Sequence, residues 1–576
     1  MLTHTTSPRE TMTDSTHLAG STSGIVSERD GRGERGRALP EALGVVALAL
    51  VVRLVGITRE PAGDELYHVL SARQYLTDGV PGINGGVYDR VPLFTSMVAG
   101  AYRFLGESMF AARLPALIGG VLLTLVMFLW LRREHSRTAA WIAAGLLALD
   151  PLMVELSQYS RFYTLQLFCF ALAAVAAYEA ARPRTGPGRR FAFGTASLLA
   201  LLGAVYFQAV SIVGGGGIAL FVALLAGGTL IGRLPASRRL PAALGAGVAA
   251  VLGVALVFAS PVGAMMIRMA TYTDTWAAST ASTPQYYHWF LQGSYPLLWG
   301  LFPLVAAAAL VARWRPALLC LCIFGVAFAA HSLMAWKTPR YFAYALPFFF
   351  AMVGIALADT VPAMARWLGR AARRLPLLAA APGVRRAALA AVALGLAAFA
   401  VANTPALMRT IEVLRRDHRF LYPGGPTPTL SWRLAAPTLR PIVDSVETVV
   451  STEDLEAFYF LGRASFVLDR DHLNQGSRLP EFSVDPRIRT PMVSERASLE
   501  RIVACSPSGV VVAMRWALRS SYKMPRETAE FIESRLTPVP LPKASGLVAF
   551  RWESPAIDAA ACDGLAAREA RAATAR

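Results

Sequence analysis

Long apolar runs dominate this sequence and decide what the chain can fold into. An α-helix needs roughly 20 apolar residues to cross the hydrocarbon core of a membrane. About eleven runs near that length lie at 39–57, 110–131, 138–152, 162–181, 191–209, 211–231, 241–260, 295–312, 316–335, 341–358 and 387–402. Only 16% of the residues are charged, against about 25% in soluble domains. The pattern predicts an all-α polytopic membrane protein.

Three regions of different composition divide the chain. Residues 1–38 carry almost no bulky apolar side chains, so we expect a disordered tail. Residues 39–402 contain the predicted spans. Residues 403–576 are polar, and their short apolar runs, as in ETVVSTE, SFVLDRD and GVVVAMR, are typical of buried strands. Together with an amphipathic helix in PRETAEFIESRL, these runs predict a small α/β domain, with a frayed tail beyond about residue 556.

The basic residues of the loops orient the spans. Five connections are rich in arginine and contain one acid, Glu134: 132–137, 182–190, 232–239, 312–316 and 365–374. Positively charged loops face the cytoplasm. All five do so only if the short apolar segment 92–105 does not cross, so we expect a juxtamembrane or re-entrant helix there. This topology predicts a multi-pass protein of the cell (inner or plasma) membrane, with a cytoplasmic N-terminus and an extracytoplasmic C-terminal domain.

The same argument accounts for the formal net charge of +18. The basic residues lie in membrane loops, so we expect contact with membrane lipids and none with nucleic acid. The cysteines Cys505 and Cys562 lie in the polar C-terminal part. They could form a disulfide if that part is outside the cytoplasm.

Charged residues of both signs gather on the predicted outer face. The first outer loop, 58–109, contributes five of the thirteen. The full set is Asp64, Glu65, His68, Asp89, Arg90, Arg113, Glu155, Tyr159, Arg161, Arg268, Asp274, Lys337 and Arg340. Ionisable groups at or within a membrane are costly and usually functional. Such a mixed cluster suits an anionic, lipid-linked substrate.

Asp64 and Glu65 form an adjacent acid pair in GDELYH, at the start of a predicted helix. One interpretation is structural, because Asp caps helix N-termini and Glu suits the helix dipole. The other gives Asp64 a chemical role, and the two are compatible. His68 lies one turn further on, either as a polar interface residue or as a site residue.

Arg90 and Arg161 are candidate ligands for a phosphate. A guanidinium offers forked donors to phosphate oxygens, although Arg90 could instead extend to the lipid head groups. Arg161 lies between Tyr159 and Tyr163 where a span begins, close to Glu155. This mixture at a membrane boundary favours a site over a simple anchor.

A second cationic boundary lies at 337–349, KTPRYFAYALPFF. Lys337 and Arg340, with Tyr341 beside them, have the spacing to hold a phosphate. The alternative is a belt of aromatic and cationic anchors at the membrane interface. Arg113, one turn inside the second span, is interpreted as such an interfacial anchor.

The order of these motifs resembles a known family. The acid pair follows the first span, Arg90-Val91-Pro92-Leu93 closes the loop, and FxxRLPAxxGG (110–120), QYSRFYTLQLF (158–168) and PRYFAYALPFF (339–349) follow. Over about residues 39–360 the chain resembles GT-C membrane glycosyltransferases of the dolichyl-phosphate-mannose protein mannosyltransferase and aminoarabinose (lipid A) transferase type, including the bacterial RgtA/B/C/D-like group. The family's usual Lys-Pro-Pro appears here as Arg90-Val91-Pro92, which keeps the cation.

The resemblance implies a GT-C helix bundle that transfers a sugar from a polyprenyl-phosphate donor, with inversion, to a hydroxyl of a lipid, cell-envelope glycan or protein. It implies that Asp64 is the catalytic residue, with Glu65 beside it. We expect the substrate to be bound by Arg90, Tyr159, Arg161, Lys337, Arg340, Tyr341 and His68. No cofactor is implied; a divalent cation on Asp64 or Glu65 is chemically compatible, although no ligand spacing argues for one.

The alternative function is a polytopic lipid or sugar transporter or flippase without catalysis. Transporters tend to place charge near the membrane midplane and to contain internal repeats. Here the charge collects at one predicted face, and we detect no repeat between the two halves of the chain. The sequence therefore favours the enzyme.

Overall fold

The computed structural model of the protein describes residues 22–61, 63–242, 283–335, 337–372, 405–415, 430–470, 479–521 and 523–553, with isolated residues at 245–264, 473 and 562. Several predicted features lie outside these residues. They are the spans 241–260 (in most of its length) and 387–402, the tail 1–21, most of the loop 261–282, and nearly all of the C-terminal tail.

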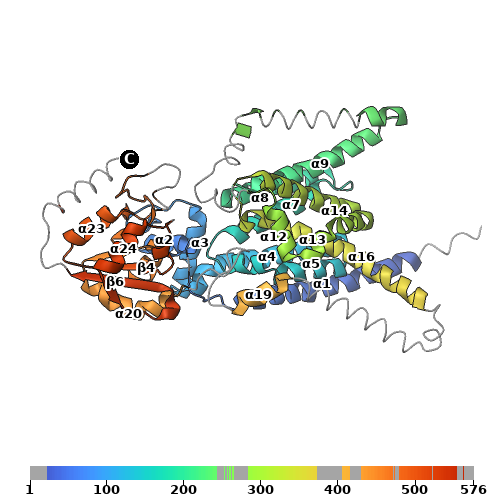
Figure 1. Ribbon diagram of the computed structural model, residues 1–576. Helices are drawn as coiled ribbons and strands as arrows, with labels where there is room; N and C mark the ends of the chain where they lie inside the picture. Colours follow the sequence, from blue (N-terminus) through green and yellow to red (C-terminus); the bar gives the residue numbers. More distant parts are fainter. Residues whose placement is uncertain are drawn as a thin grey trace, which may run out of the picture.

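A helix bundle makes up one part of the molecule (Figure 1). Its elements are α1 (Thr22–Leu54), α4 (Met109–Glu134), α5 (Arg137–Leu149), α6 (Pro151–Ser157), α7 (Tyr163–Ala180), α8 (Pro187–Phe207), α9 (Ser211–Gly232), α12 (Tyr286–Ser294), α13 (Pro296–Gly300), α14 (Phe302–Leu333), α15 (Pro339–Phe342), η1 (Ala343–Ala345), α16 (Leu346–Ala372) and α19 (Pro405–Arg415). Within the described residues, six helices are long and apolar enough to cross a membrane, or seven if the bent pair α5–α6 is one span. The protein is thus a polytopic helical membrane protein, as predicted.

Two elements differ from the predicted boundaries. Helix α1 begins at Thr22, inside the stretch 1–38 that the composition marks as a tail, because a helix formed in the apolar half propagates at little cost. The runs 295–312 and 316–335 lie largely in one helix, α14, which is broken at Arg313 (φ −150°, ψ 83°). Pro316 explains the break, since its ring clashes with the preceding turn.

Two short helices, α2 (Glu65–Asp78) and α3 (Pro92–Leu105), lie between the bundle and the C-terminal domain (Figure 1). Helix α3 has 14 residues, which at 1.5 Å per residue is about 21 Å, shorter than the roughly 30 Å hydrocarbon core. This length fits the juxtamembrane helix expected at 92–105.

The C-terminal domain is an α/β unit, as the short apolar runs predict. It comprises α20 (Trp432–Ser445), β1 (Thr448–Ser451), α21 (Asp454–Leu461), β2 (Phe466–Leu468), β3 (Met492–Val493), α23 (Arg496–Cys505), β4 (Ser508–Met514), η2 (Ala517–Arg519), α24 (Arg526–Arg535), β5 (Thr537–Val539), η3 (Lys543–Ser545) and β6 (Leu547–Glu553). The strand order is β3-β2-β1-β4-β6-β5. Strands β3, β2, β1 and β4 are parallel, which requires the crossover helices α21 and α23.

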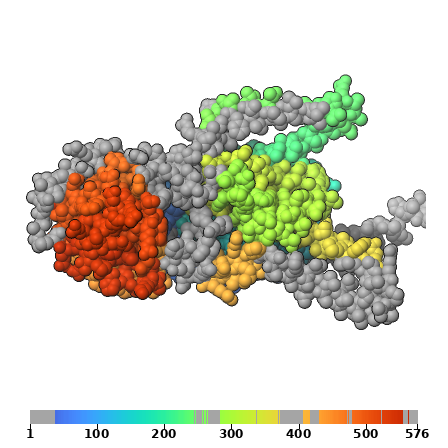
Figure 2. Space-filling model, in the orientation of Figure 1, coloured from blue at the N-terminus to red at the C-terminus, as the bar shows by residue number. Residues whose placement is uncertain are grey.

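The domain forms a separate lobe at one end of the bundle, orange to red in Figure 2.

Strand β6 pairs antiparallel with both β4 and β5, with Val511 opposite Phe550. Among the residues that the structure describes, Cys505 and Cys562 are not joined by a disulfide. The disulfide left open by the sequence is thus not formed here.

Candidate functional site

Asp64 lies at the N-cap position of α2, but its side chain does not cap the helix. Its backbone is helical (φ −49°, ψ −26°), and within the described residues its carboxylate accepts no hydrogen bond from the first turn. Instead, Arg340 Nη1 donates to Asp64 Oδ2 at 3.0 Å, and Arg161 Nη2 lies 4.0 Å from the same oxygen. The capping interpretation is therefore wrong, and the carboxylate, 41% exposed, points toward cations.

Three arginines from three separate elements converge on this carboxylate. Arg161 lies in the turn between α6 and α7, where Nη1 donates to the Asp64 carbonyl at 2.9 Å and to the Tyr88 hydroxyl at 3.1 Å. Arg340 lies on α15. Arg90 precedes α3, close enough for its charge to act on Asp64.

Aromatic rings back the three guanidinium groups. The ring of Phe162 lies 5.6 Å from Arg90 Cζ and 5.1 Å from Arg161 Cζ. The ring of Tyr163 lies 5.5 Å from Arg340 Cζ, and that of Tyr341 lies 5.8 Å from the same atom. Such contacts stabilise a cation without neutralising it, so the charge stays available to a ligand.

The cations control the ionisation of Asp64. Burial by itself would raise the pKa of Asp64, but the charges of Arg161 and Arg340, with a smaller effect from Arg90, hold that pKa below its ordinary value. Asp64 is therefore ionised at neutral pH. Because three guanidinium groups surround one carboxylate, the site is suited to a further anion.

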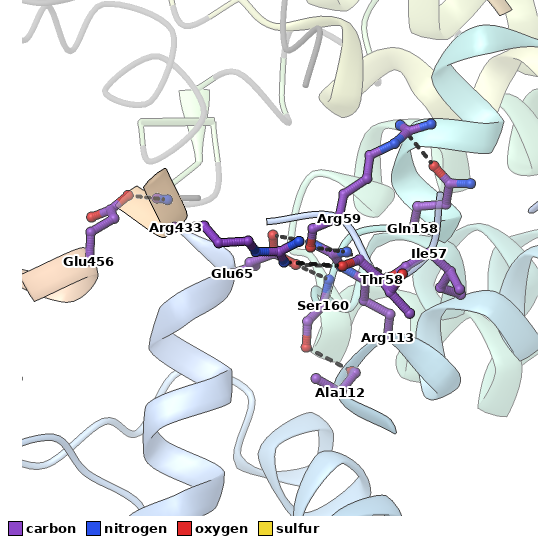
Figure 3. A network of polar contacts seen from close by, with 11 residues as sticks. Ile57, Thr58, Arg59, Glu65, Ala112, Arg113, Gln158, Ser160, Arg433 and Glu456 are labelled. Carbon is purple, nitrogen blue, oxygen red and sulfur yellow. Dashed lines mark hydrogen bonds and ion pairs between the residues drawn. The ribbon is translucent and has the colours of Figure 1, made fainter. Parts of the chain in front are cut away.

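Glu65 is enclosed in a separate network, shown in Figure 3. Arg113 donates to both carboxylate oxygens, at 2.8 and 3.1 Å, and the Ser160 N–H donates at 3.1 Å. Both charged side chains are 0% exposed. Arg113 also donates to the carbonyls of Ile57 and Arg59. The interpretation of Arg113 as an interfacial anchor is wrong: it holds Glu65 and the end of the first span together.

His68 and Tyr159 lie behind the site. His68 is fully buried, its Nδ1 is 2.9 Å from the Thr95 hydroxyl, and its ring packs edge-on against Phe94 and Tyr88. Burial, reinforced by the nearby arginines, places the pKa of His68 well below its ordinary value, so the ring is neutral. Tyr159 is buried, and its carbonyl accepts from the Arg161 N–H at 2.6 Å.

The structure separates the expected site residues into three groups. Asp64, Arg90, Arg161, Arg340 and Tyr341 come together. Glu65, His68 and Tyr159 support them from behind. Lys337 forms the third group: its Nζ donates to the carbonyl of Met334, close to the end of α14.

Two participants were not predicted from the sequence. Tyr88 accepts from Arg161, and its proximity in sequence to Asp89-Arg90 was the available signal. Glu456 of α21 lies 393 positions from its partner Gly63, and no local pattern marks such a contact. Within the described residues, no group of three or more His, Cys, Asp or Glu side chains could hold a metal ion.

The C-terminal domain contacts the first outer loop at several points. Glu456 Oε1 accepts from the Gly63 N–H at 2.7 Å. Glu60 accepts from the Ser431 hydroxyl at 2.8 Å and from the Arg433 N–H at 3.0 Å. The Val87 N–H donates to the Pro486 carbonyl at 3.1 Å, and the Arg487 guanidinium lies 4.9 Å from the centre of the Tyr67 ring.

The loop and the domain also touch along their backbones. A Cβ on Gly86 would lie 2.4 Å from the Arg487 carbonyl oxygen, so only glycine permits this approach. The C-terminal domain is thus part of the wall that holds Asp64.

No known family model and no curated protein matches the chain in sequence. Solved structures do match. The chain aligns with ArnT from Cupriavidus metallidurans at a TM-score of 0.57 and 17% identity, covering 89% of this chain and 98% of that one. The structure of the same ArnT bound to undecaprenyl phosphate aligns at a TM-score of 0.57 and 16% identity, again covering 89% of this chain and 98% of that one.

An archaeal oligosaccharyltransferase, AglB from Archaeoglobus fulgidus, in complex with an inhibitory peptide and a dolichol-phosphate, aligns at a TM-score of 0.51 and 14% identity. That alignment covers 86% of this chain and 72% of AglB. The protein has the GT-C fold of membrane glycosyltransferases.

Proposed function

We propose that the protein is a membrane glycosyltransferase that moves a sugar from a polyprenyl-phosphate donor to a hydroxyl acceptor, with inversion, at the outer face of the cell membrane. The carrying observation is the convergence of Arg90, Arg161 and Arg340 on Asp64. The solved ArnT holds undecaprenyl phosphate, and AglB holds a dolichol-phosphate. These neighbours support a lipid-linked donor here.

The arginines bind the phosphate of the donor. Arg340 is only partly buried, and its Nη1 donates to Asp64. We expect its forked guanidinium to offer a further donor to a phosphate oxygen. Arg161 is held rigidly by the Asp64 carbonyl and by Tyr88. Fixed cations stabilise the negative charge that develops on a departing phosphate without reorganising during the reaction.

Asp64 accepts the proton. The acceptor O–H gives its proton to the carboxylate, the acceptor oxygen bonds to C1 of the sugar, and the bond from C1 to the phosphate oxygen breaks. The products are the glycoside and the polyprenyl phosphate. When the donor phosphate recruits Arg340, Asp64 loses a counter-ion, its pKa rises, and it becomes a stronger base.

Buried residues next to the site keep Asp64 and the arginines in place. Glu65 and Arg113 anchor the first turn of α2, and His68 with Phe162 fills the space beneath Tyr88. We assign Glu65 and His68 to positioning, and Asp64 to catalysis.

A direct assay separates this proposal from the transporter alternative. Purified protein is incubated with radiolabelled polyprenyl-phosphate sugars and a membrane lipid extract. We expect release of polyprenyl phosphate together with labelled acceptor. Movement of the donor across a vesicle membrane without cleavage would favour the transporter and contradict the proposal.

Arg340→Gln is expected to weaken donor binding by about 10- to 100-fold, because a hydrogen bond to a charged group is worth about 1.5–3 kcal/mol. Arg340→Lys should restore part of the loss, since it keeps the charge and loses the fork. The measurement is KM for the donor, with Kd for polyprenyl phosphate as a second readout.

Arg73→Gln is the matched control. Arg73 belongs to α2 and pairs with Glu107 in an exposed contact, away from the arginine cluster. It should leave donor KM unchanged. An Arg340→Gln protein with wild-type KM and Kd would remove Arg340 from the phosphate site.

A further inference from the structure

A carboxyl of the C-terminal domain holds the residue directly before Asp64. Glu456 is 7% exposed, and its Oε1 accepts from the Gly63 N–H at 2.7 Å. Figure 3 shows Glu456 apart from the Glu65–Arg113 network, reaching the loop from the C-terminal domain. A hydrogen bond to an ionised acceptor is roughly twice as strong as one between neutral groups.

The contact falls on a turn of the chain at Gly63. Its φ is +52°, in the left-handed region that favours glycine. The turn therefore rests on glycine's freedom and on the carboxylate that holds its N–H. We therefore expect a change at Glu456 to alter the backbone of Gly63 and, through it, the position of Asp64.

Glu456 shares its buried surroundings with other acids. Lys523 Nζ donates to Asp469 Oδ2 at 2.6 Å and lies 3.7 Å from Glu453 Oε1. The titratable and charged groups around α21 include Asp454 and Tyr459 on that helix, Glu453 directly before it, Asp469 after β2, Lys523 before α24, Tyr67 and Arg73 on α2, Arg440 on α20, and Asp485 with Arg487. Lys523 is close to both Asp469 and Glu453. Because one positive charge cannot balance all the neighbouring carboxylates, ionisation of Glu453 and Glu456 is disfavoured.

Burial raises the pKa of Glu456 to about 7 and that of Glu453 to about 8. For Glu456, the hydrogen bond from the Gly63 N–H and the charge of Lys523 oppose the shift, and Asp454 adds to it. The charge of this carboxyl pair therefore changes within the ordinary working range of pH. The bond to Gly63 changes strength with it.

We propose that Glu456 is a positioning residue that couples the C-terminal domain to Asp64, so that loss of its charge loosens the catalytic loop and lowers sugar transfer. This inference rests on the proposed function. The other contacts, from Glu60 to Ser431 and from Val87 to Pro486, keep the loop docked when Glu456 is neutral. The effect is then local to Gly63 and Asp64, and the domain stays in place.

Stability responds in the opposite direction. The folded-state pKa of Glu456 lies above its ordinary value of 4.5, so its contribution to stability is fully present below about 4.5 and is lost as pH rises through about 7. Ionisation thus favours activity and costs stability. A residue with a merely structural role would move both quantities together.

The test is the pH profile of kcat in the sugar-transfer assay, between pH 5.5 and 8.5. The wild-type protein should lose activity as pH falls through about 7. Glu456→Gln keeps an oxygen acceptor without the charge, so it should be about 5- to 10-fold slower at pH 8, nearly flat with pH, and unchanged in donor KM. Its unfolding temperature at pH 8 should equal or exceed that of the wild type.

Two further variants complete the design. Glu60→Gln weakens a comparable loop-to-domain contact and should retain the wild-type profile. Asp454→Asn removes the acidic neighbour whose charge raises the pKa of Glu456 and should shift the inflection to lower pH. Wild-type rate and profile in Glu456→Gln would overturn the inference, as would an unmoved inflection in Asp454→Asn. If Asp64→Asn also keeps full activity, the proposed function itself fails; if only the Glu456 result fails, the proposed function stands.

Discussion

Replacing Asp64 with Asn is expected to lower kcat for sugar transfer by about 10²- to 10⁴-fold, the usual contribution of a general base. Asparagine keeps the shape of the side chain but cannot accept the proton of the acceptor hydroxyl. Donor binding should hold or tighten, because Arg340 loses the carboxylate that competes with the phosphate. The measurements are kcat with the labelled donor and Kd for polyprenyl phosphate, made on the same preparation.

Asp89→Asn provides the control for this result. Asp89 belongs to the same loop and is exposed, so the variant should retain kcat close to wild type. Full activity in Asp64→Asn would exclude Asp64 as the base. A loss of kcat accompanied by an equal loss of phosphate binding would instead show that Asp64 orders the arginines.

The carboxyl groups of Asp64 and Glu456 are expected to affect the protein in different ranges of pH. The pKa of Asp64 lies below its ordinary value of 3.8, so the stability that its ion pairs contribute is present above that pH and is lost only in stronger acid. Without donor, Asp64 is ionised throughout the neutral range. The donor phosphate raises the pKa of Asp64 when it takes up Arg340, so an acidic limb of kcat near pH 7 is assigned to Glu456, whose pKa is raised to about 7, only if Glu456→Gln removes that limb.

The sequence predicts what depends on composition and local period. Within the described residues, apolar runs of membrane length identified the six helices, or seven with the bent pair, that could cross a membrane. Three short β-type runs identified β1, β2 and β4. Charges collected at one face identified Asp64, Arg161 and Arg340, which the structure brings together. These predictions hold because the composition of each segment reflects whether it faces lipid, water or the protein interior.

The pairing of charges could not be predicted in the same way. The N-cap rule gave Asp64 a backbone partner, but Arg340, 276 positions away, took the carboxylate. Arg113 has the sequence context of an interface anchor, yet it is fully buried against Glu65. Burial and partner choice depend on how separate segments pack, so a single sequence leaves them open.

Replacing Arg113 with Met is expected to destabilise the protein by about 3–5 kcal/mol, because it leaves the Glu65 carboxylate buried without its counter-ion. The pair is 0% exposed and joined by two hydrogen bonds, and the lost donors also held the Ile57 and Arg59 carbonyls. The unfolding midpoint in detergent, followed by intrinsic fluorescence, measures the effect.

The matched control and the double variant identify the cause. Arg73→Met removes an exposed ion pair to Glu107, whose side chains are 41% and 44% exposed, and it should cost no more than about 1 kcal/mol. Adding Glu65→Met to Arg113→Met removes the stranded charge and should recover much of the stability, since apolar groups can replace a buried pair. Recovery should be incomplete, because the Ser160 N–H loses its acceptor. If the double variant is as unstable as Arg113→Met, the cost comes from lost packing and the carbonyl contacts, and the buried charge is not its source.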